Sequence, residues 1–148
     1  MIVLAAVLVA ASACGLVWRQ RNGRLRATGA AADRAAANGS PAAAQPAQVL
    51  TAAELGGPLG GRATLVQFST AFCAPCRATR VVLADVAGLV DGVTHVEIDA
   101  ESRLDLVRRL DIRRTPTVLV LGPDGRIARR GSGQPRKADV IAALGEVG

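Results

Sequence analysis

Between Val49 and Gly148, short apolar runs alternate with segments whose apolar residues recur at helical spacing. This alternation constrains the fold more than any other feature of the chain. After a helical turn at 51–55, the expected order is strand (64–68), helix (73–87), strand (93–98), helix (from 102), strand (117–121), strand (126–130) and helix (from 135). A βαβα unit followed by ββα predicts an α/β fold, a mixed four-stranded sheet flanked by helices.

The apolar spacing also predicts the buried face of each helix. We expect Leu89, Leu104 and Ile141 to face the core. Ser102 is expected to cap the second helix, because its hydroxyl can accept a backbone N–H.

The N-terminal residues have a different composition. Ile2 to Trp18 is a run of 17 residues without a charge, and as a helix it would span roughly 25 Å, just enough to cross a bilayer. Trp18 stands where interfacial aromatic residues occur, and arginines follow it. We interpret residues 2–18 as a transmembrane anchor.

A cleaved signal peptide, or lipidation at Cys14, is the alternative. No Lys or Arg precedes the run, so the usual basic region is missing. The Leu expected three residues before a lipidated cysteine is also absent, and apolar residues continue past Cys14 to Trp18. These features favour an uncleaved anchor with Cys14 in the lipid.

Residues 19–48 are interpreted as a basic juxtamembrane flank and an Ala-rich linker. Eleven of the 22 residues 27–48 are Ala, without apolar periodicity, which predicts a semi-flexible tether. Residues 49–148 then form one domain of ordinary size.

The net charge of +6 is distributed unevenly. Residues 19–34 contribute +4, whereas residues 49–148, with 13 Lys+Arg against 11 Asp+Glu, contribute +2. Basic residues such as Arg19–Arg26, beside a membrane helix, suit anionic lipid headgroups. Phe68 and Phe72 are too few to stack nucleic-acid bases. We therefore expect a membrane partner and no nucleic acid.

The motif Cys-Ala-Pro-Cys at residues 73–76 stands between a predicted strand and a predicted helix. Cys73 would lie at the helix N-terminus, where unpaired N–H groups and the helix dipole stabilise a thiolate. Cys76 lies one turn along and could attack a mixed disulfide at Cys73, while Arg77 and Arg80 add positive charge. The pattern predicts a redox-active pair.

Two other cysteine chemistries fit less well. A zinc site needs four ligands, and His95 is the only further candidate besides Cys14. Thr70, three residues before Cys73, suggests a peroxidatic cysteine, but Val66 stands where that pattern has Pro. We expect no metal and no cofactor.

Taken in order, the motifs resemble the thioredoxin family over nearly all of residues 49–148. The residues that carry the resemblance are 66–76, 115–117 and 122–125. It implies a thioredoxin-like fold, with a cis peptide between Thr115 and Pro116 opposite the cysteines and an extended substrate segment paired with the Thr115 backbone. Phe72 and Pro75 are further candidates for substrate contact.

The sequence departs from the family pattern at four positions. Phe72 stands where the family usually has Trp and Ala74 where it usually has Gly, and both replacements bear on the redox potential and on the direction of net electron flow. Gln67 stands where thioredoxins commonly have a buried Asp that helps to deprotonate the resolving cysteine. His95 replaces the usual Lys near that Asp. Since imidazole titrates near neutral pH, His95 is a candidate proton acceptor for Cys76, with a structural role as the alternative.

The resemblance implies a thiol–disulfide oxidoreductase acting through Cys73 and Cys76, and the anchor predicted at residues 2–18 would tether it to a membrane. Its partners would be disulfide-containing or dithiol proteins and an electron donor or acceptor. The alternative is a non-enzymatic thioredoxin-like module that docks a partner or passes on a metal or haem thiol. The arginines after the anchor favour a cytoplasmic domain, whereas anchored thioredoxin-like domains often face away from the cytoplasm.

Overall fold

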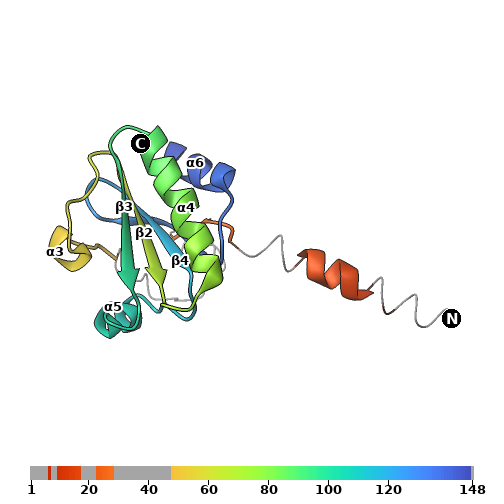
Figure 1. Cartoon of the computed structure of the whole chain (residues 1–148). Helices are drawn as coiled ribbons and strands as arrows, with labels where there is room; N and C mark the ends of the chain where they lie inside the picture. Colours follow the sequence, from red (N-terminus) through yellow and green to blue (C-terminus); the bar gives the residue numbers. More distant parts are fainter. Residues whose placement is uncertain (1–6, 8–9, 18–22, 29–47, 148) are drawn as a thin grey trace, which may run out of the picture.

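The computed structural model describes residues 7, 10–17, 23–28 and 48–147 (Figure 1). Within the predicted anchor, residues 10–17 are helical, whereas 2–6, 8–9 and 18 lie outside the described part. Among the described residues, no helix has both the length and the apolar character needed to cross a bilayer. The anchor therefore stays a prediction.

A mixed five-stranded sheet lies at the centre of the domain. Its strands are β1 (Arg26–Ala27), β2 (Ala63–Ser69), β3 (Val93–Asp99), β4 (Thr117–Leu121) and β5 (Ile127–Ser132), in the order β1-β5-β4-β2-β3. β2 and β3 are parallel, whereas the other neighbours are antiparallel. The four strands expected from the sequence are all present as β2 to β5, in a mixed arrangement.

Within residues 48–147, four helices cover the two faces of the sheet. α4 (Ala74–Leu89) and α6 (Lys137–Gly145) pack on one face, and α3 (Ala52–Leu55) and α5 (Leu104–Arg109) pack on the other (Figure 1). The short α3 begins at a capping box, in which the Thr51 N–H donates to the Glu54 carboxylate at 2.8 Å.

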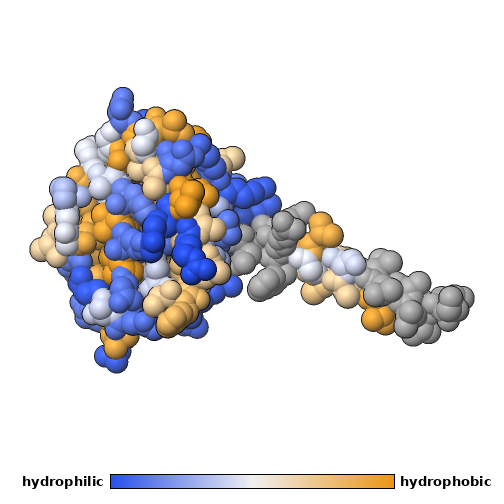
Figure 2. Space-filling model, viewed as in Figure 1, coloured by the Kyte–Doolittle hydropathy of each residue, from blue (hydrophilic) through white to orange (hydrophobic). Residues whose placement is uncertain are grey.

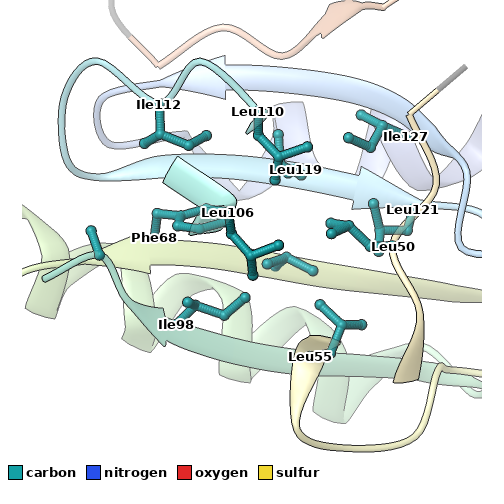
Figure 3. Packing of buried hydrophobic residues seen from close by; sticks show 12 residues of the cluster. Leu50, Leu55, Phe68, Ile98, Leu106, Leu110, Ile112, Leu119, Leu121 and Ile127 are labelled. Atoms are coloured by element: carbon teal, nitrogen blue, oxygen red, sulfur yellow. The ribbon is translucent and has the colours of Figure 1, made fainter. Parts of the chain in front are cut away.

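Each face of the sheet has its own apolar cluster. On the α3/α5 face, Phe68 of β2 packs with Leu106 of α5 (Figure 3). On the α4/α6 face, Leu65 of β2 packs with Leu83 of α4 and Leu144 of α6. Burying each of these side chains contributes about 1.5–3 kcal/mol. β2 is buried along its whole length. This burial fixes the position at which the strand ends and the loop toward Cys73 begins.

The strand β1 lies in the segment that we interpreted as flank and linker. It pairs with Arg129–Arg130 of β5, and the Gly23 N–H donates to the Ser132 carbonyl at 2.8 Å. Leu25 packs against the α4/α6 cluster. Residues 27–28 of the predicted tether are therefore paired with the edge of β5, which offers backbone partners, and Leu25 of the predicted flank packs on the cluster.

The far end of the Ala-rich segment also lies against β5. The Ile127 N–H donates to the Gln48 carbonyl at 3.0 Å, and the Thr28 N–H donates to the Ala128 carbonyl at 3.1 Å. Residues 29–47, which lie outside the described part, thus connect two points on the same strand.

Three apolar side chains expected in the core are exposed instead. Leu89, Leu104 and Ile141 have exposed fractions of 64 %, 49 % and 46 %, because the buried stripes pass through Leu83, Leu106 and Leu144. Figure 2 shows such hydrophobic residues among hydrophilic ones on the surface. Ser102 does not cap α5 either, because its hydroxyl donates to the Asp99 carbonyl at 3.1 Å.

Candidate active site

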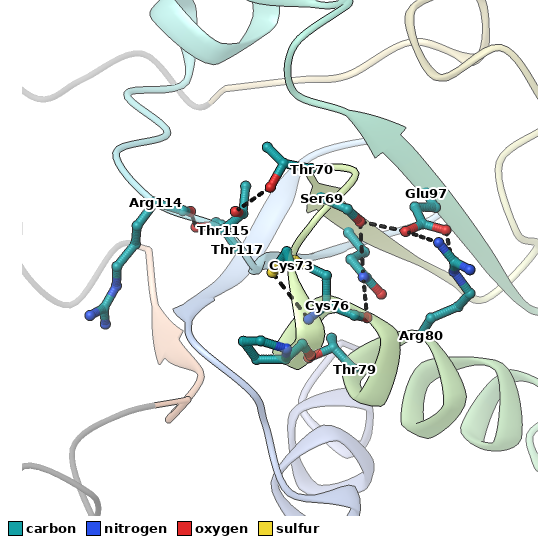
Figure 4. The surroundings of a disulfide bond; sticks show 12 residues. Ser69, Thr70, Cys73, Cys76, Thr79, Arg80, Glu97, Arg114, Thr115 and Thr117 are labelled. Carbon is teal, nitrogen blue, oxygen red and sulfur yellow. Dashed lines mark hydrogen bonds and ion pairs between the residues drawn. A yellow bond between two sulfur atoms is a disulfide. The ribbon is translucent and has the colours of Figure 1, made fainter.

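Cys73 and Cys76 lie where β2 leads into α4. Cys73 is the N-cap of α4, Cys76 lies in its first turn, and the two form a disulfide with Cα atoms 5.2 Å apart (Figure 4). The Cys76 N–H donates to Sγ of Cys73 at 3.2 Å. The predicted position at a helix N-terminus is confirmed, and the same N–H can stabilise a Cys73 thiolate after reduction.

The two sulfur-bearing residues differ in accessibility. Cys76 is 1 % exposed, whereas Cys73 is only partly buried. A cavity of about 430 Å³ opens beside them, lined by Ser69, Thr70, Ala71, Cys73, Cys76, Arg77, Arg80, Glu97 and Asp99. A reactant from solution can therefore approach Cys73, while Cys76 is accessible chiefly to Cys73.

A chain of hydrogen bonds connects Cys76 to a carboxylate on β3. Nε2 of Gln67 donates to the Cys76 carbonyl at 2.9 Å and to Oγ of Ser69 at 3.0 Å. Oγ of Ser69 in turn donates to Oε1 of Glu97 at 2.5 Å (Figure 4). Gln67 cannot replace an acidic residue as a proton acceptor, but it holds the first turn of α4 in place.

Sequence reasoning missed Ser69 and Glu97. The signal that could have found Glu97 is the two-residue period of β3, which places it on the same face as His95. Ser69 bonds to both Gln67 and Glu97, so finding it requires knowing that the pairing of β2 with β3 sets Gln67 opposite Glu97.

Glu97 forms an ion pair with Arg80. Nε and Nη2 of Arg80 donate to the two carboxylate oxygens at 2.5 and 2.8 Å. The hydrogen bonds from Arg80 hold the pKa of Glu97 below its usual range, and the bond from Ser69 adds to this while burial opposes it. The carboxylate is therefore ionised at neutral pH and offsets the positive charge that we expected Arg80 to supply at the cysteines.

His95 lies on β3 opposite Leu65, and it does not line the cavity beside the cysteines. Its Nε2 is buried and has no hydrogen-bond partner among the described residues. Burial lowers the pKa of His95, opposed by the charge of Glu97 and assisted by that of Arg80. The imidazole is thus neutral at pH 7. Its role as a proton acceptor for Cys76 stays a prediction.

The peptide bond between Thr115 and Pro116 is cis, as the resemblance implies. Pro116 is buried, and Oγ1 of the partly buried Thr115 lies 3.2 Å from Oγ1 of Thr70 (Figure 4). The Gly133 N–H donates to the Pro116 carbonyl at 2.7 Å. These contacts hold the cis-proline loop against the loop that leads to Cys73.

Phe72 and Pro75 flank the disulfide. The Phe72 side chain is 100 % exposed, and Pro75 is exposed in the first turn of α4, where its carbonyl accepts from Oγ1 of Thr79 at 2.9 Å. An exposed aromatic ring beside the reactive sulfur offers an apolar contact to a docking polypeptide. Substrate binding by Phe72, Pro75, Thr115 and Pro116 stays a prediction.

The remaining potential metal ligands are dispersed. Within the part of the chain that the structure describes, no group of three or more His, Cys, Asp or Glu side chains is placed to hold a metal ion. Cys14 is exposed and forms no disulfide.

A dithiol–disulfide pair at a helix N-terminus, beside a cis-proline loop on a mixed α/β sheet, defines the thioredoxin-like class of proteins. The family model for thioredoxin matches residues 59–146. The chain belongs to the thioredoxin family.

Known relatives agree with this assignment. Thioredoxin H4-1 of Oryza sativa subsp. japonica is 29 % identical over 87 residues, which are 58 % of this chain and 66 % of that protein. Thioredoxin H5 of the same plant is 28 % identical over 61 residues, 41 % and 45 % of the two chains. This chain thus spans less than two thirds of the length of these relatives.

Two solved structures are similar as well. Chloroplastic thioredoxin z superposes with a TM-score of 0.54 at 29 % identity, covering 59 % of this chain and 79 % of that one. A mutant thioredoxin from Halobacterium salinarum gives the same TM-score at 20 % identity, covering 59 % and 75 %, and supports the fold alone.

Proposed function

We propose that this chain is a membrane-tethered thiol–disulfide oxidoreductase that exchanges disulfides with protein substrates. The observation that carries the proposal is the asymmetry of the pair, in which a partly exposed Cys73 at a helix N-terminus is bonded to a buried Cys76. Such an arrangement separates an attacking sulfur from a resolving one.

The reaction follows from this asymmetry. In the reduced form, the Cys73 thiolate attacks one sulfur of a substrate disulfide, so that a mixed disulfide forms and the other substrate sulfur leaves as a thiolate. Cys76 then loses its proton and attacks Sγ of Cys73, which releases the second substrate thiolate and restores the Cys73–Cys76 disulfide. One substrate disulfide is reduced while one dithiol pair is oxidised.

The hydrogen bonds around Cys76 prepare the second step. Gln67 fixes the Cys76 carbonyl, and the Cys73 N–H donates to the Thr70 carbonyl at 3.3 Å. Because both cysteines are anchored through their backbones, the resolving sulfur stays within reach of the mixed disulfide. This proximity favours resolution over escape of the intermediate.

Replacing each cysteine separately tests the chemistry. Cys73→Ser should abolish the reduction of insulin disulfides with dithiothreitol as the electron source, because no accessible sulfur remains at the N-terminus of α4. Cys76→Ser should instead accumulate covalent protein–substrate disulfides, visible on a non-reducing gel. Cys14→Ser is the matched control and should keep full turnover. Wild-type turnover in Cys73→Ser, or a native pair that does not cycle with dithiothreitol, would contradict the proposal.

The membrane tether rests on residues 2–18 and the arginines that follow them. We place the domain on the cytoplasmic face by the distribution of positive charge, with the anionic lipid surface near Arg19–Arg26. A reporter fused to Gly148 that is active on one side of the membrane checks the orientation. Recovery of the full chain in the soluble fraction would contradict the tether and leave the chemistry standing.

A further inference from the structure

A second cavity, of about 440 Å³, lies where β1 meets β5. Four of its lining residues are arginines, namely Arg24, Arg26, Arg114 and Arg130, and we call it the arginine cavity. No acidic side chain is among the described residues that line it. Four like charges around one hollow favour an anionic occupant.

The register between β1 and β5 explains why the arginines converge. Arg26 is directly opposite Arg130, and directly opposite residues in an antiparallel pair share one face of the sheet. Leu25 packs against the α4/α6 cluster on the other face. Gly131 permits the close approach, because a Cβ there would lie 3.0 Å from the Arg24 carbonyl oxygen. The pairing of β1 thus brings two arginines to the two already on the domain.

The hydrogen bonds that Arg130 makes to carbonyl groups leave its positive charge in place. Arg130 donates to the Leu110 and Asp111 carbonyls at 2.6 and 2.5 Å, and Arg114 donates to the Ser132 carbonyl at 3.2 Å. The two carbonyl acceptors orient the Arg130 guanidinium group without cancelling its charge. Arg130 is half-buried, and burial is the largest influence on its pKa and lowers it, opposed by the charge of Asp111 and assisted by that of Arg113. Partly desolvated cations attract anions more strongly than solvated ones.

Neighbouring residues and a side-chain contact connect the arginine cavity to the active site. Arg114 directly precedes Thr115, whose hydroxyl bonds to Thr70 at 3.2 Å, and Thr70 lines the cavity that contains Cys73. Figure 4 shows the Arg114 guanidinium on the side of the loop away from Cys73, toward β1. A polypeptide segment that lies along the cis-proline loop therefore passes from the reactive sulfur to the arginine cavity.

We propose that the arginine cavity binds acidic side chains of the substrate protein that flank the cysteine reacting with Cys73. The inference rests on the proposed oxidoreductase function and names the class of substrate, a disulfide within an acidic segment. The two arginines of β1 make the N-terminal segment part of the substrate-binding surface.

Short disulfide peptides of equal length test this substrate preference in the full chain. One peptide carries glutamates beside the reacting cysteine, one glutamines and one lysines, and their reduction is followed by chromatography. We expect kcat/KM for the glutamate peptide to exceed that for the lysine peptide by about threefold to tenfold, and the ratio to fall as salt is added. Equal values for the three peptides would overturn the inference.

Variants of Arg26 assign the preference to the cavity. Arg26→Gln should reduce the ratio between glutamate and lysine peptides, Arg26→Glu should remove or reverse it, and Arg26→Lys should keep most of it. Arg62→Gln is the control, because this exposed arginine precedes β2 and is far in the chain from the cis-proline loop. A ratio that is unchanged in Arg26→Glu would overturn the inference.

Two further outcomes bear on what the arginine cavity binds. If the native chain reduces the glutamine peptide but shows no preference, the inference fails and the oxidoreductase function stands; if it reduces no peptide, both fail. If Arg26→Glu weakens binding to phosphatidylserine vesicles and leaves the peptide preference intact, the cavity serves a lipid surface and the inference is overturned.

Discussion

The two faces of β2 carry different residues and have different neighbours. Val66 and Phe68 join the apolar cluster under α3 and α5, whereas on the α4 face Leu65 is followed by the buried polar residues Gln67 and Ser69. The polar side chains begin where β2 approaches Cys73. One strand therefore supplies stability through one face and organises the reactive pair through the other, and substitutions on the two faces should have separable effects.

The largest effect is expected from Phe68→Ala on the apolar face. Phe68 is completely buried, and removing a phenyl ring from such a site lowers the free energy of unfolding by about 3–5 kcal/mol. Urea denaturation of the full chain measures it, with Val81→Ala, at a site 69 % exposed, as a control expected to change by about 0.5 kcal/mol or less. A loss of stability no larger than that of the control would show that the apolar face of β2 does not supply the stability assigned to it.

On the polar face, Glu97→Gln should change the chemistry of the cysteines. It removes a negative charge from the cavity and frees the charge of Arg80, and both changes favour a thiolate. The pH midpoint of Cys73 alkylation by iodoacetamide should fall by about half a unit to one unit. Glu54→Gln makes the same chemical change on the opposite face and should leave the midpoint where it is. Equal shifts in the two variants would show that the faces are not separable.

Glu54 should instead affect stability in acid. The hydrogen bond from Arg109, with that from the Thr51 N–H, lowers the pKa of Glu54 from 4.5 to about 2. Because the folded pKa lies below the unfolded one, the stabilisation is present above pH 4.5 and is lost as the pH falls toward 2. Arg109 and Glu54 are 48 % and 25 % exposed, so screening limits the contribution to about 1 kcal/mol or less.

Urea unfolding at pH 7 and pH 3 measures this contribution. The difference in stability between the native chain and Glu54→Gln should be larger at pH 7 than at pH 3. Parallel loss of stability in both proteins would exclude Glu54 as the cause.

The smallest effect is expected from Thr70→Val. It removes the hydroxyl contact with Thr115 and leaves the Thr70 carbonyl, which accepts from the Cys73 N–H, in place. A hydrogen bond of this kind contributes about 1 kcal/mol, so KM for a protein substrate should rise by about fivefold or less. An unchanged KM would indicate that the cis-proline loop keeps its position without this contact.

The sequence predicted those features that depend on nearby residues. The four strands β2 to β5, the helix that begins after Cys73 and the cysteine pair all follow from local periodicity or a short motif. The wrong assignments of Leu104 and Ile141 occurred in helices of 6 and 9 residues, where few turns define the buried stripe.

The features that the sequence did not predict depend on register between distant segments. Arg26 meets Arg130 although these residues lie near opposite ends of the chain, and Gln67 meets Glu97 only through the pairing of β2 with β3. Composition shows that residues 19–48 are basic and Ala-rich, but it does not show that an edge strand is available to bind part of them.

The attachment of both Thr28 and Gln48 to β5 limits the distance between the domain and the predicted anchor. Because Thr28 and Gln48 are both bonded to this strand, the number of residues between them adds no length between the domain and the residues before Gly23. Gly23 is five residues after Trp18, and at about 3.5 Å per residue the chain between them can reach roughly 18 Å. If residues 2–18 span a bilayer, the domain works in a thin layer above the lipid. Under the proposed function, disulfides close to the lipid surface would then be nearest to Cys73, and bulky partners would have to approach from the side that faces away from the bilayer.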